Sequence, residues 1–267
     1  MENYFSSENF QEINRAFLQG DAVKTSFFLR NSRLILAEEC YFFLMSSMRK
    51  MRMKIPLTCT LEFFQNLFQT EVIGKGVSNG IINFMAYRNR TEMLPSKAEV
   101  AFFFEVDKVT DVLSLQREFE MDMIKEINVN TNLLSNIRVH CPENVFAEVY
   151  AIENDLDDVI LQNPNKRIAR SIFGNLLFLS GNTIKIPKLS EGALISPLLE
   201  SFITFIHSNN LALIELSEMI GFESQKADEI LMISDEKGIF PVMKIRNKTF
   251  SKDRFSEMIE KWKSSFE

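Results

Sequence analysis

Short apolar runs, each of β-strand length, follow one another through the second half of the chain. Three of them read DDVILQN, LLFLSGN and TIKIP, and the tripeptide Ser180-Gly181-Asn182 separates the last two. Glycine beside asparagine between two apolar runs is typical of a tight hairpin turn. A second pair, EILMIS and FPVMKI, follows closer to the C-terminus. This half of the chain therefore predicts a sheet of short strands.

The first half mixes strands with amphipathic helices. KTSFFLRNSRLILAE predicts two strands around the polar turn Arg30-Asn31-Ser32-Arg33, and GIINFMAYRN and EVAFFFEVDKV predict a strand pair. Apolar residues recur at helical spacing from Glu38 to Met53. Pro56 ends that pattern, and Thr60 is a suitable N-cap for a second helix. Further helices are predicted over residues 132–155, 196–209, 211–219 and 251–264. The fold class is therefore mixed α+β.

Length and charge distribution suggest two domains. A chain of 267 residues suits one large domain or two smaller ones. Residues 107–127 are charged and only weakly periodic, which is typical of a connecting segment. We therefore expect an N-terminal α+β domain over residues 1–110, a linker over 111–127 and a C-terminal domain over 128–267.

Charge and cysteine content argue against several classes of protein. The net charge is −6, and no basic block is interleaved with aromatic residues, so we expect no nucleic-acid partner. The cluster Arg49, Lys50, Arg52 and Lys54 is interpreted as a solvated helix end. The three cysteines lack C-x-x-C spacing and the two histidines lack ligands at metal-binding spacing. Neither a disulfide framework nor a metal site is therefore predicted.

The ends and the apolar runs bear on the compartment. The N-terminus, MENYFSSENF, lacks the basic region of a secretory signal. The longest apolar runs, such as VAFFFEV, are far too short to span a membrane. We therefore expect a cytoplasmic protein without a membrane partner. The 25 phenylalanines suit a packed core and also an oligomer interface.

One ordered set of motifs in the second half is specific enough to suggest a family. From Asn175 to Gly192 the chain reads N-L-x-F, then G-N-x-I-x-x-P-x-L-S-E-G, and A-D-E and G-I-x-P-V follow. With NRAFLQGDAVKTSFFLRNSRLILAEECYFFL near the start and KTFSKDRFSEMIEKW at the end, the chain resembles the class IV aminotransferases. That family includes branched-chain and D-amino-acid aminotransferases and aminodeoxychorismate lyase.

The resemblance implies a fold, a cofactor and an assembly. The expected fold is a two-domain one, with a small N-terminal α/β lobe and a C-terminal β-barrel-like lobe with helices. The expected cofactor is pyridoxal phosphate (PLP), bound near the domain boundary, and the expected assembly is a homodimer. PLP acts as an electron sink that the protein must hold and tune.

The lysine that would form the Schiff base with PLP is not found where the resemblance requires it. Two alignments put that position at Ile137 or at Arg138, and no lysine lies between Glu126 and Asn165. Arginine stays protonated and is a poor nucleophile, so neither residue can replace the lysine amine. Lys125 lies about a dozen residues too early and is interpreted as an exposed charge.

The two charged groups that would face PLP are also changed. The resemblance implies a glutamate opposite the pyridine nitrogen at the position of Arg170, where a cation reverses the required electrostatics. It implies a phosphate-binding arginine at the position of Phe43, whose ring cannot neutralise a phosphate.

The expected phosphate loop departs from the family pattern as well. Ser196-Pro197 stands where a glycine-containing turn is expected, and Pro197 has no N–H to give to an anion. Asp235 and Glu236 fall beside a loop that would approach the phosphate, and their charges would repel it.

The sequence therefore predicts a catalytically degenerate homologue, a pseudoenzyme, that needs no PLP and acts as a binding or subunit protein. Its altered cleft is expected to be filled by side chains or to hold a small anionic ligand. The alternative is an active PLP-dependent aminodeoxychorismate lyase or amino-acid aminotransferase that uses Lys125 as a displaced lysine. A repurposed enzyme without PLP is a third hypothesis, but the chain offers no Ser/His/Asp grouping or phosphate loop for it.

Overall fold

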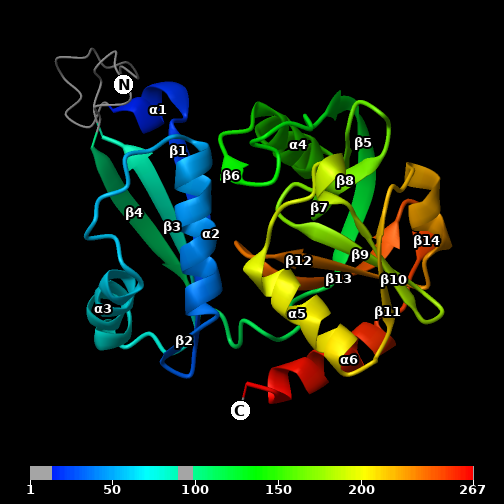
Figure 1. Cartoon of the computed structure of the whole chain (residues 1–267). Helices are drawn as coiled ribbons and strands as arrows, with labels where there is room; N and C mark the ends of the chain where they lie inside the picture. The colour runs from blue at the N-terminus through cyan, green and yellow to red at the C-terminus, as the bar shows by residue number, and fades with distance from the viewer. Residues whose placement is uncertain (1–13, 90–98, 267) are drawn as a thin grey trace.

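The chain forms two lobes, each built on one sheet (Figure 1). The structure is a computed structural model, and it describes residues 14–89 and 99–266. The polar N-terminus over residues 1–13, which bears on the expected compartment, lies outside the described residues. No helix among the described residues is long and apolar enough to cross a membrane.

The N-terminal lobe is an antiparallel sheet with two helices packed against it. Its strands lie in the order β2-β1-β3-β4. In chain order its elements are α1 (Arg15–Gln19), β1 (Ala22–Arg30), β2 (Arg33–Ile35), α2 (Ala37–Lys50), α3 (Leu61–Glu71), the 3-10 helix η1 (Ile73–Lys75), β3 (Gly80–Arg88) and β4 (Val100–Asp107).

Local signals in the sequence explain how these elements begin and end. Asn31 and Ser32 have positive φ angles of 50° and 60°, as a two-residue hairpin between β1 and β2 requires. The Thr60 hydroxyl accepts a hydrogen bond from the Phe63 N–H at 3.2 Å, so Thr60 caps α3 as expected. The strand pair predicted from GIINFMAYRN and EVAFFFEVDKV is confirmed by β3 and β4.

Phenylalanines form much of the core between the N-terminal sheet and its helices. Phe27 on β1, Phe64 and Phe68 on α3, and Phe84 on β3 are each almost fully buried. The Phe27 ring lies 4.9 Å from Phe68 and 5.8 Å from Phe64, measured between centroids. Part of the phenylalanine content is thereby accounted for by core packing rather than by an interface.

The C-terminal lobe is a larger mixed sheet with helices against it. Its strands lie in the order β11-β10-β9-β12-β13-β5-β7-β8, and β14 pairs with β13. In chain order its elements are β5 (Phe119–Asn128), α4 (Pro142–Glu153), β7 (Asp158–Gln162), β8 (Ile168–Ser171), β9 (Asn175–Ser180), β10 (Thr183–Pro187), η3 (Leu189–Glu191), α5 (Pro197–Ser208), β11 (Leu213–Ser217), η4 (Gly221–Lys226), β12 (Glu229–Ser234), β13 (Gly238–Ile245), β14 (Lys248–Thr249) and α6 (Asp253–Ser264). The short strand β6 (Arg138–Val139) lies between β5 and α4 in the chain but belongs to the N-terminal sheet, where it pairs with β1.

This larger sheet curls toward closure. Ile168, at the start of β8, donates its N–H to the Met219 carbonyl at 2.7 Å, and Arg167 forms an isolated bridge with Ile220. The chain that follows β11 at one end of the sheet therefore meets β8 at the other end. The result is a half-barrel, so the expected mixed fold with a barrel-like C-terminal lobe is confirmed.

The expected linker over residues 111–127 is wrong in its second part. Phe119–Asn128 is strand β5, which pairs in parallel with β13 and β7 inside the larger sheet. Its acidic side chains hide the alternation of apolar and polar residues that is typical of a strand, and they form ion pairs with β13 and the residue that follows it. Glu120 pairs with Lys244, and Asp122 pairs with Arg246.

Two predicted helices also need correction. The helix predicted over residues 132–155 begins only at Pro142, and Arg138–Val139 is a short strand instead. Proline at the first helical position has no N–H for the preceding turn, so it marks the start of α4. The segment 211–219, predicted as a helix, contains strand β11, which pairs in parallel with β10. The prediction failed because so short an apolar run fits strand and helix spacing equally.

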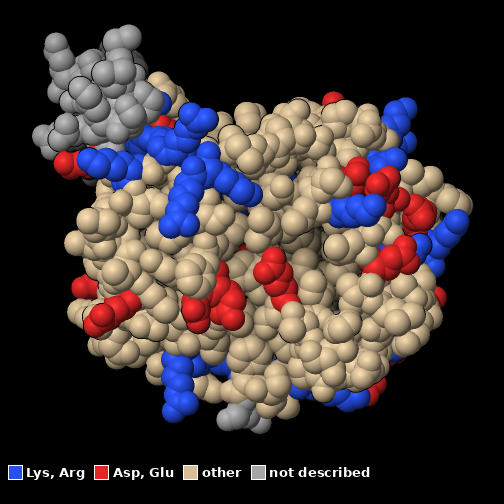
Figure 2. Space-filling model, in the orientation of Figure 1, with Lys and Arg blue, Asp and Glu red and all other residues tan. Residues whose placement is uncertain are grey.

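The basic cluster near the end of α2 lies at the surface. Arg49, Arg52 and Lys54 are exposed, and Arg49 and Lys50 lie in the last turn of α2, where cations favour the helix dipole. Figure 2 shows basic side chains gathered at the upper left, where Figure 1 places this end of α2. The arrangement agrees with the interpretation of a solvated helix end.

Candidate functional site

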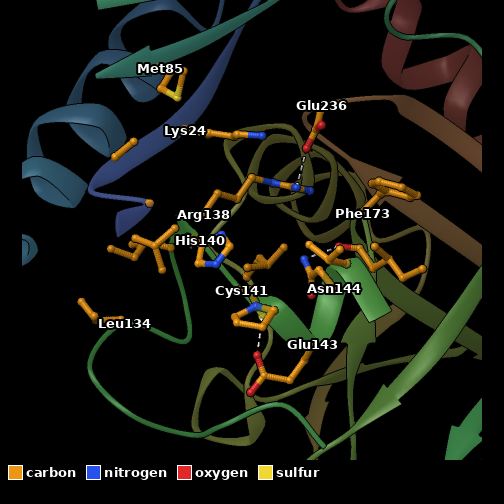
Figure 3. A pocket seen from close by; sticks show the side chains of 18 of the residues that line it. Lys24, Met85, Leu134, Arg138, His140, Cys141, Glu143, Asn144, Phe173 and Glu236 are labelled. Atoms are coloured by element: carbon orange, nitrogen blue, oxygen red, sulfur yellow. Dashed lines mark hydrogen bonds and ion pairs between the residues drawn. The ribbon is translucent and has the colours of Figure 1, made fainter. Parts of the chain in front are cut away.

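A large cavity lies between the two lobes. Its volume is about 890 Å³, within the range of small-molecule pockets. The N-terminal lobe contributes side chains of α1, β1, β3 and β4, and the C-terminal lobe contributes the segment 129–148 together with residues near 172 and 236. Figure 3 shows side chains that line this cavity, with Lys24 and Arg138 both extending toward Glu236.

Strand β6 joins the two halves of the cavity wall. Although its residues precede α4, β6 pairs with β1 of the N-terminal sheet, with Arg138 opposite Lys24 and Val139 opposite Val23. Side chains directly opposite in an antiparallel pair lie close together on one face. Lys24 and Arg138 therefore stand side by side in the cavity wall (Figure 3).

Arg138 has an acidic partner, whereas Lys24 has none. The Arg138 Nη1 lies 2.6 Å from the Glu236 Oε2, and a dashed line marks this ion pair in Figure 3. Within residues 14–89 and 99–266 no ion pair or side-chain hydrogen bond engages the Lys24 ammonium, and this side chain is exposed.

Arg170 is a buried cation that lines the cavity. Its guanidinium donates to the carbonyls of Ser171 at 2.9 Å and Ile172 at 3.3 Å, and to the Asn144 Oδ1 at 2.8 Å. No carboxylate forms an ion pair with it in the described part of the chain, and its Nε has no hydrogen-bond partner there. Burial lowers the pKa of Arg170, and the nearby charge of Arg138 lowers it further.

Cys141 is the N-cap residue of α4 and also lines the cavity. Its thiol donates to the Glu143 Oε2 at 3.2 Å, and the Arg170 Nη2 lies 3.7 Å from its sulfur. Burial raises the pKa of Cys141, although Arg170 acts in the opposite direction. The thiol is therefore held protonated, which makes it a poor nucleophile.

The N-terminus of α5 is capped by a buried carboxylate of the chain itself. Asp235 follows β12, and its Oδ1 accepts hydrogen bonds from the Ser196 hydroxyl at 2.6 Å and the Leu198 N–H at 3.2 Å. Ser196 also accepts from the Leu199 N–H at 3.1 Å, and Pro197 occupies the first helical position. Burial raises the pKa of Asp235 to about 6, while the Ser196 hydrogen bond and the charge of Arg138 oppose that rise.

The residues singled out from the sequence fall into two groups. Ile137, Arg138 and Arg170 line the cavity. Phe43 is instead buried on α2 in the hydrophobic core, and Ser196 and Pro197 are buried at the start of α5. Lys125 is exposed on β5 and is not among the residues that line the cavity. The structure thus brings three of these positions together.

Sequence reasoning missed several residues of the site. Lys24, His140 and Lys237 all line the cavity. The Lys237 ammonium lies 3.5 Å from the centre of the Phe173 ring, a cation–π contact. Lys24 is the single exposed residue of the otherwise buried β1. A lone lysine within a largely apolar strand is the sequence signal that could have indicated this site residue. His140 and Lys237 carried no comparable signal.

Gly20 allows α1 to end against His140. Its φ angle is 62°, the left-handed conformation of a helix C-cap. A Cβ added there would lie 2.5 Å from the His140 Cβ. Both the conformation and the close approach therefore require glycine. Among the described residues no group of three or more acidic, cysteine or histidine side chains is placed to hold a metal ion.

Comparison with known proteins identifies relatives of the whole fold. The family described as "Amino-transferase class IV" matches residues 25–245. A putative 4-amino-4-deoxychorismate lyase from Legionella pneumophila is 16% identical, with a TM-score of 0.82, over 99% of this chain and 96% of that one.

Two aminotransferase structures are equally similar. A branched-chain aminotransferase from Thermoproteus uzoniensis is 14% identical, with a TM-score of 0.83, over 96% of this chain and 90% of that one. A branched-chain amino acid aminotransferase from Thermobaculum terrenum, solved in its PLP form, is 15% identical, with a TM-score of 0.82, over 94% and 87%. At such identities the likeness concerns the fold. No curated protein matches the sequence.

Proposed function

The chain belongs to the class IV aminotransferase family, and we propose that it is a catalytically degenerate member that binds a small molecule without PLP. The observation that carries this proposal is the buried Asp235 carboxylate at the start of α5. Helix N-termini bind phosphate because their free N–H groups and the helix dipole attract anions. Here Asp235 already accepts from the Leu198 N–H and the Ser196 hydroxyl.

A phosphate dianion at this helix end would meet unfavourable surroundings. It would have to displace the Asp235 carboxylate or lie beside it, and Pro197 offers no N–H in the first helical position. Two anions in one buried site repel each other strongly, because the local dielectric screens them poorly. The donors of this helix end therefore do not fit the phosphate of PLP.

The groups that would face the rest of the cofactor also do not fit. A protonated pyridine nitrogen needs an anion, but Arg170 is a buried cation surrounded by neutral acceptors. Ile137 and Arg138, the two candidate positions for the lysine, carry no amine. We infer that the cavity has kept its place between the lobes while its side chains no longer suit PLP.

A PLP-dependent lyase or aminotransferase is the second candidate. It is favoured by family membership, by the PLP form of the Thermobaculum terrenum relative, and by the presence of two lysines in the cavity wall. Lys24 faces Arg138 across the strand pair, and Lys237 lies on the Phe173 ring. Lys125, the displaced lysine considered from the sequence, does not support this second candidate, because it is not among the residues that line the cavity.

Absorption spectroscopy separates the two candidates. Purified protein is titrated with PLP, and the visible absorption of a lysine-bound cofactor is followed. Lys24→Gln and Lys237→Gln are measured in parallel, with the exposed Lys125→Gln as the matched control. We expect no saturable band in any of the four proteins. A saturable band in the wild type that disappears in a cavity variant and persists in Lys125→Gln would overturn the proposal.

We further propose that the protein is a homodimer. Exposed apolar side chains of α4 support this proposal, because Val145, Phe146, Val149 and Ile152 lie at helical spacing along one side of the helix. Contiguous exposed apolar surface of this kind is typical of an interaction site. Size-exclusion chromatography with light scattering measures the assembly.

A further inference from the structure

The cavity wall contains an unbalanced pair of like charges. Lys24 and Arg138 lie directly opposite each other in the β1–β6 pair, and like charges in this position destabilise a sheet. Glu236 relieves the repulsion only in part, because its carboxylate pairs with Arg138 and leaves Lys24 without a partner among the described residues. An additional anion between the two cations would remove the imbalance.

The charges of the whole lining point to a single negative charge on the missing partner. Four cationic side chains line the cavity, Lys24, Arg138, Arg170 and Lys237, against the three carboxylates Glu143, Glu148 and Glu236. Lys237 is engaged by the Phe173 ring, and Arg170 donates to neutral acceptors. Four cations against three carboxylates leave an excess of one positive charge in the lining. The Lys24 ammonium is the cation of this set that remains accessible to a ligand.

The remainder of the lining is largely apolar. Met85 and Phe103 come from the N-terminal sheet, and Ile172, Phe173 and Leu194 come from the C-terminal lobe. A cavity of about 890 Å³ with an apolar wall and few convergent charges is typical of a site for a small organic molecule. Such a wall favours a ligand with an apolar body over a bare inorganic ion.

From these observations we propose that the cavity binds an organic monocarboxylate with an apolar body, whose carboxylate lies between Lys24 and Arg138. Glu236 then acts as an internal competitor, because its carboxylate already pairs with Arg138. Figure 3 shows both cationic side chains extending toward Glu236, into the space that the ligand would share. This inference rests on the proposed function, since it requires the cavity to be free of PLP.

Three probes separate charge from shape. Benzoate carries both the carboxylate and an apolar ring, benzamide keeps the shape without the charge, and acetate keeps the charge without the ring. Their affinities are measured by ligand-observed NMR titration of the full-length protein. We expect saturable binding of benzoate, with benzamide and acetate each at least about tenfold weaker, because each lacks one of the two recognised features.

Variants of opposite expected sign test the positions of the charges. Lys24→Gln and Arg138→Gln should each weaken benzoate binding by about tenfold or more, since each removes one charge-assisted contact. Glu236→Gln should strengthen it by about threefold or more, because the competing carboxylate is gone. Lys125→Gln, which removes an exposed positive charge outside the cavity, should leave the affinity unchanged. A variant that merely damaged the fold would not tighten binding.

Each contrary result has a defined meaning. Absence of saturable benzoate binding, an unchanged affinity in Lys24→Gln, or weaker binding in Glu236→Gln would overturn the inference. If these results occur while the PLP titration shows no lysine-bound cofactor, the proposed function survives and only the ligand class is rejected. A lysine-bound cofactor in the same preparation would reject the proposed function itself.

Discussion

Replacing Asp235 with asparagine should change the free energy of unfolding in a way that depends on pH. The difference between the variant and the wild type should be more favourable to the variant at neutral pH than at acidic pH. Asparagine keeps an oxygen that can accept from the Ser196 hydroxyl and the Leu198 N–H, but it cannot ionise. The variant therefore removes the titration of a buried group while keeping the cap of α5.

The size of the effect follows from the pKa of Asp235, which burial raises from 3.8 to about 6 in the folded protein. Arg138 and Glu200 act on this carboxyl in opposite directions. Because the folded protein holds the proton more tightly than the unfolded chain, the resulting stability is complete below pH 3.8 and is lost as the pH rises through about 6. The full loss is about 3 kcal/mol, at about 1.4 kcal/mol for each pKa unit.

Urea unfolding at two pH values measures this difference. Fluorescence of Trp262, the single tryptophan, reports unfolding because this side chain of α6 is buried against Phe202 of α5. The stability of Asp235→Asn minus that of the wild type should rise by about 2 kcal/mol between about pH 4.5 and about pH 7.5. Asp158 is also buried, with its pKa raised to about 6, but it is present in both proteins and cancels in the comparison.

A matched control removes an acid that is not buried. Glu62→Gln replaces an exposed carboxylate in the first turn of α3, and its stability relative to the wild type should not show this rise across the same range. If the difference between Asp235→Asn and the wild type does not change with pH, or falls as the pH rises, the assignment of a buried titrating cap is refuted.

Three further results are expected. Phe64→Ala removes a ring that contacts Phe27 and Phe84 in the N-terminal core, and it should lower the free energy of unfolding by about 3 to 5 kcal/mol in urea titration; a loss below about 1 kcal/mol would contradict this core. Gly20→Ala should lower the thermal midpoint and weaken benzoate binding, because its Cβ would meet His140 in a left-handed conformation; an unchanged affinity would show that this contact does not shape the cavity. Val149→Glu should shift the mass measured by light scattering from dimer to monomer, since it places a charge on the exposed apolar side of α4; a wild-type monomer would contradict the proposed assembly.

Local sequence signals carried most of the fold. The hairpin at Asn31-Ser32, the cap at Thr60 and the turn at Gly181 each depend on residues within a few positions of one another. Such signals are readable without the tertiary structure. Strand β5 was not predicted, because its acidic residues look like a linker until their partners are known, which are Lys244 on β13 and Arg246 directly after that strand.

The candidate site was only partly predictable for the same reason. Arg138 and Arg170 were found through family motifs, but their surroundings depend on contacts between distant segments. Lys24 and Arg138 are more than a hundred positions apart, and only the pairing of β6 with the other lobe makes them neighbours. Asp235 was expected to repel a phosphate. That it also caps α5 could not be predicted from the sequence, because the cap depends on the packing of β12 against that helix.

Borohydride trapping gives the most direct test of whether this chain has lost PLP chemistry. The protein is incubated with PLP, reduced with borohydride, digested and analysed by peptide mass spectrometry. We predict no stoichiometric pyridoxyl group on Lys24, Lys237 or Lys125, and the same peptide masses as in a sample without PLP. A stoichiometric pyridoxyl group on one cavity lysine, abolished when that lysine is replaced, would contradict the account.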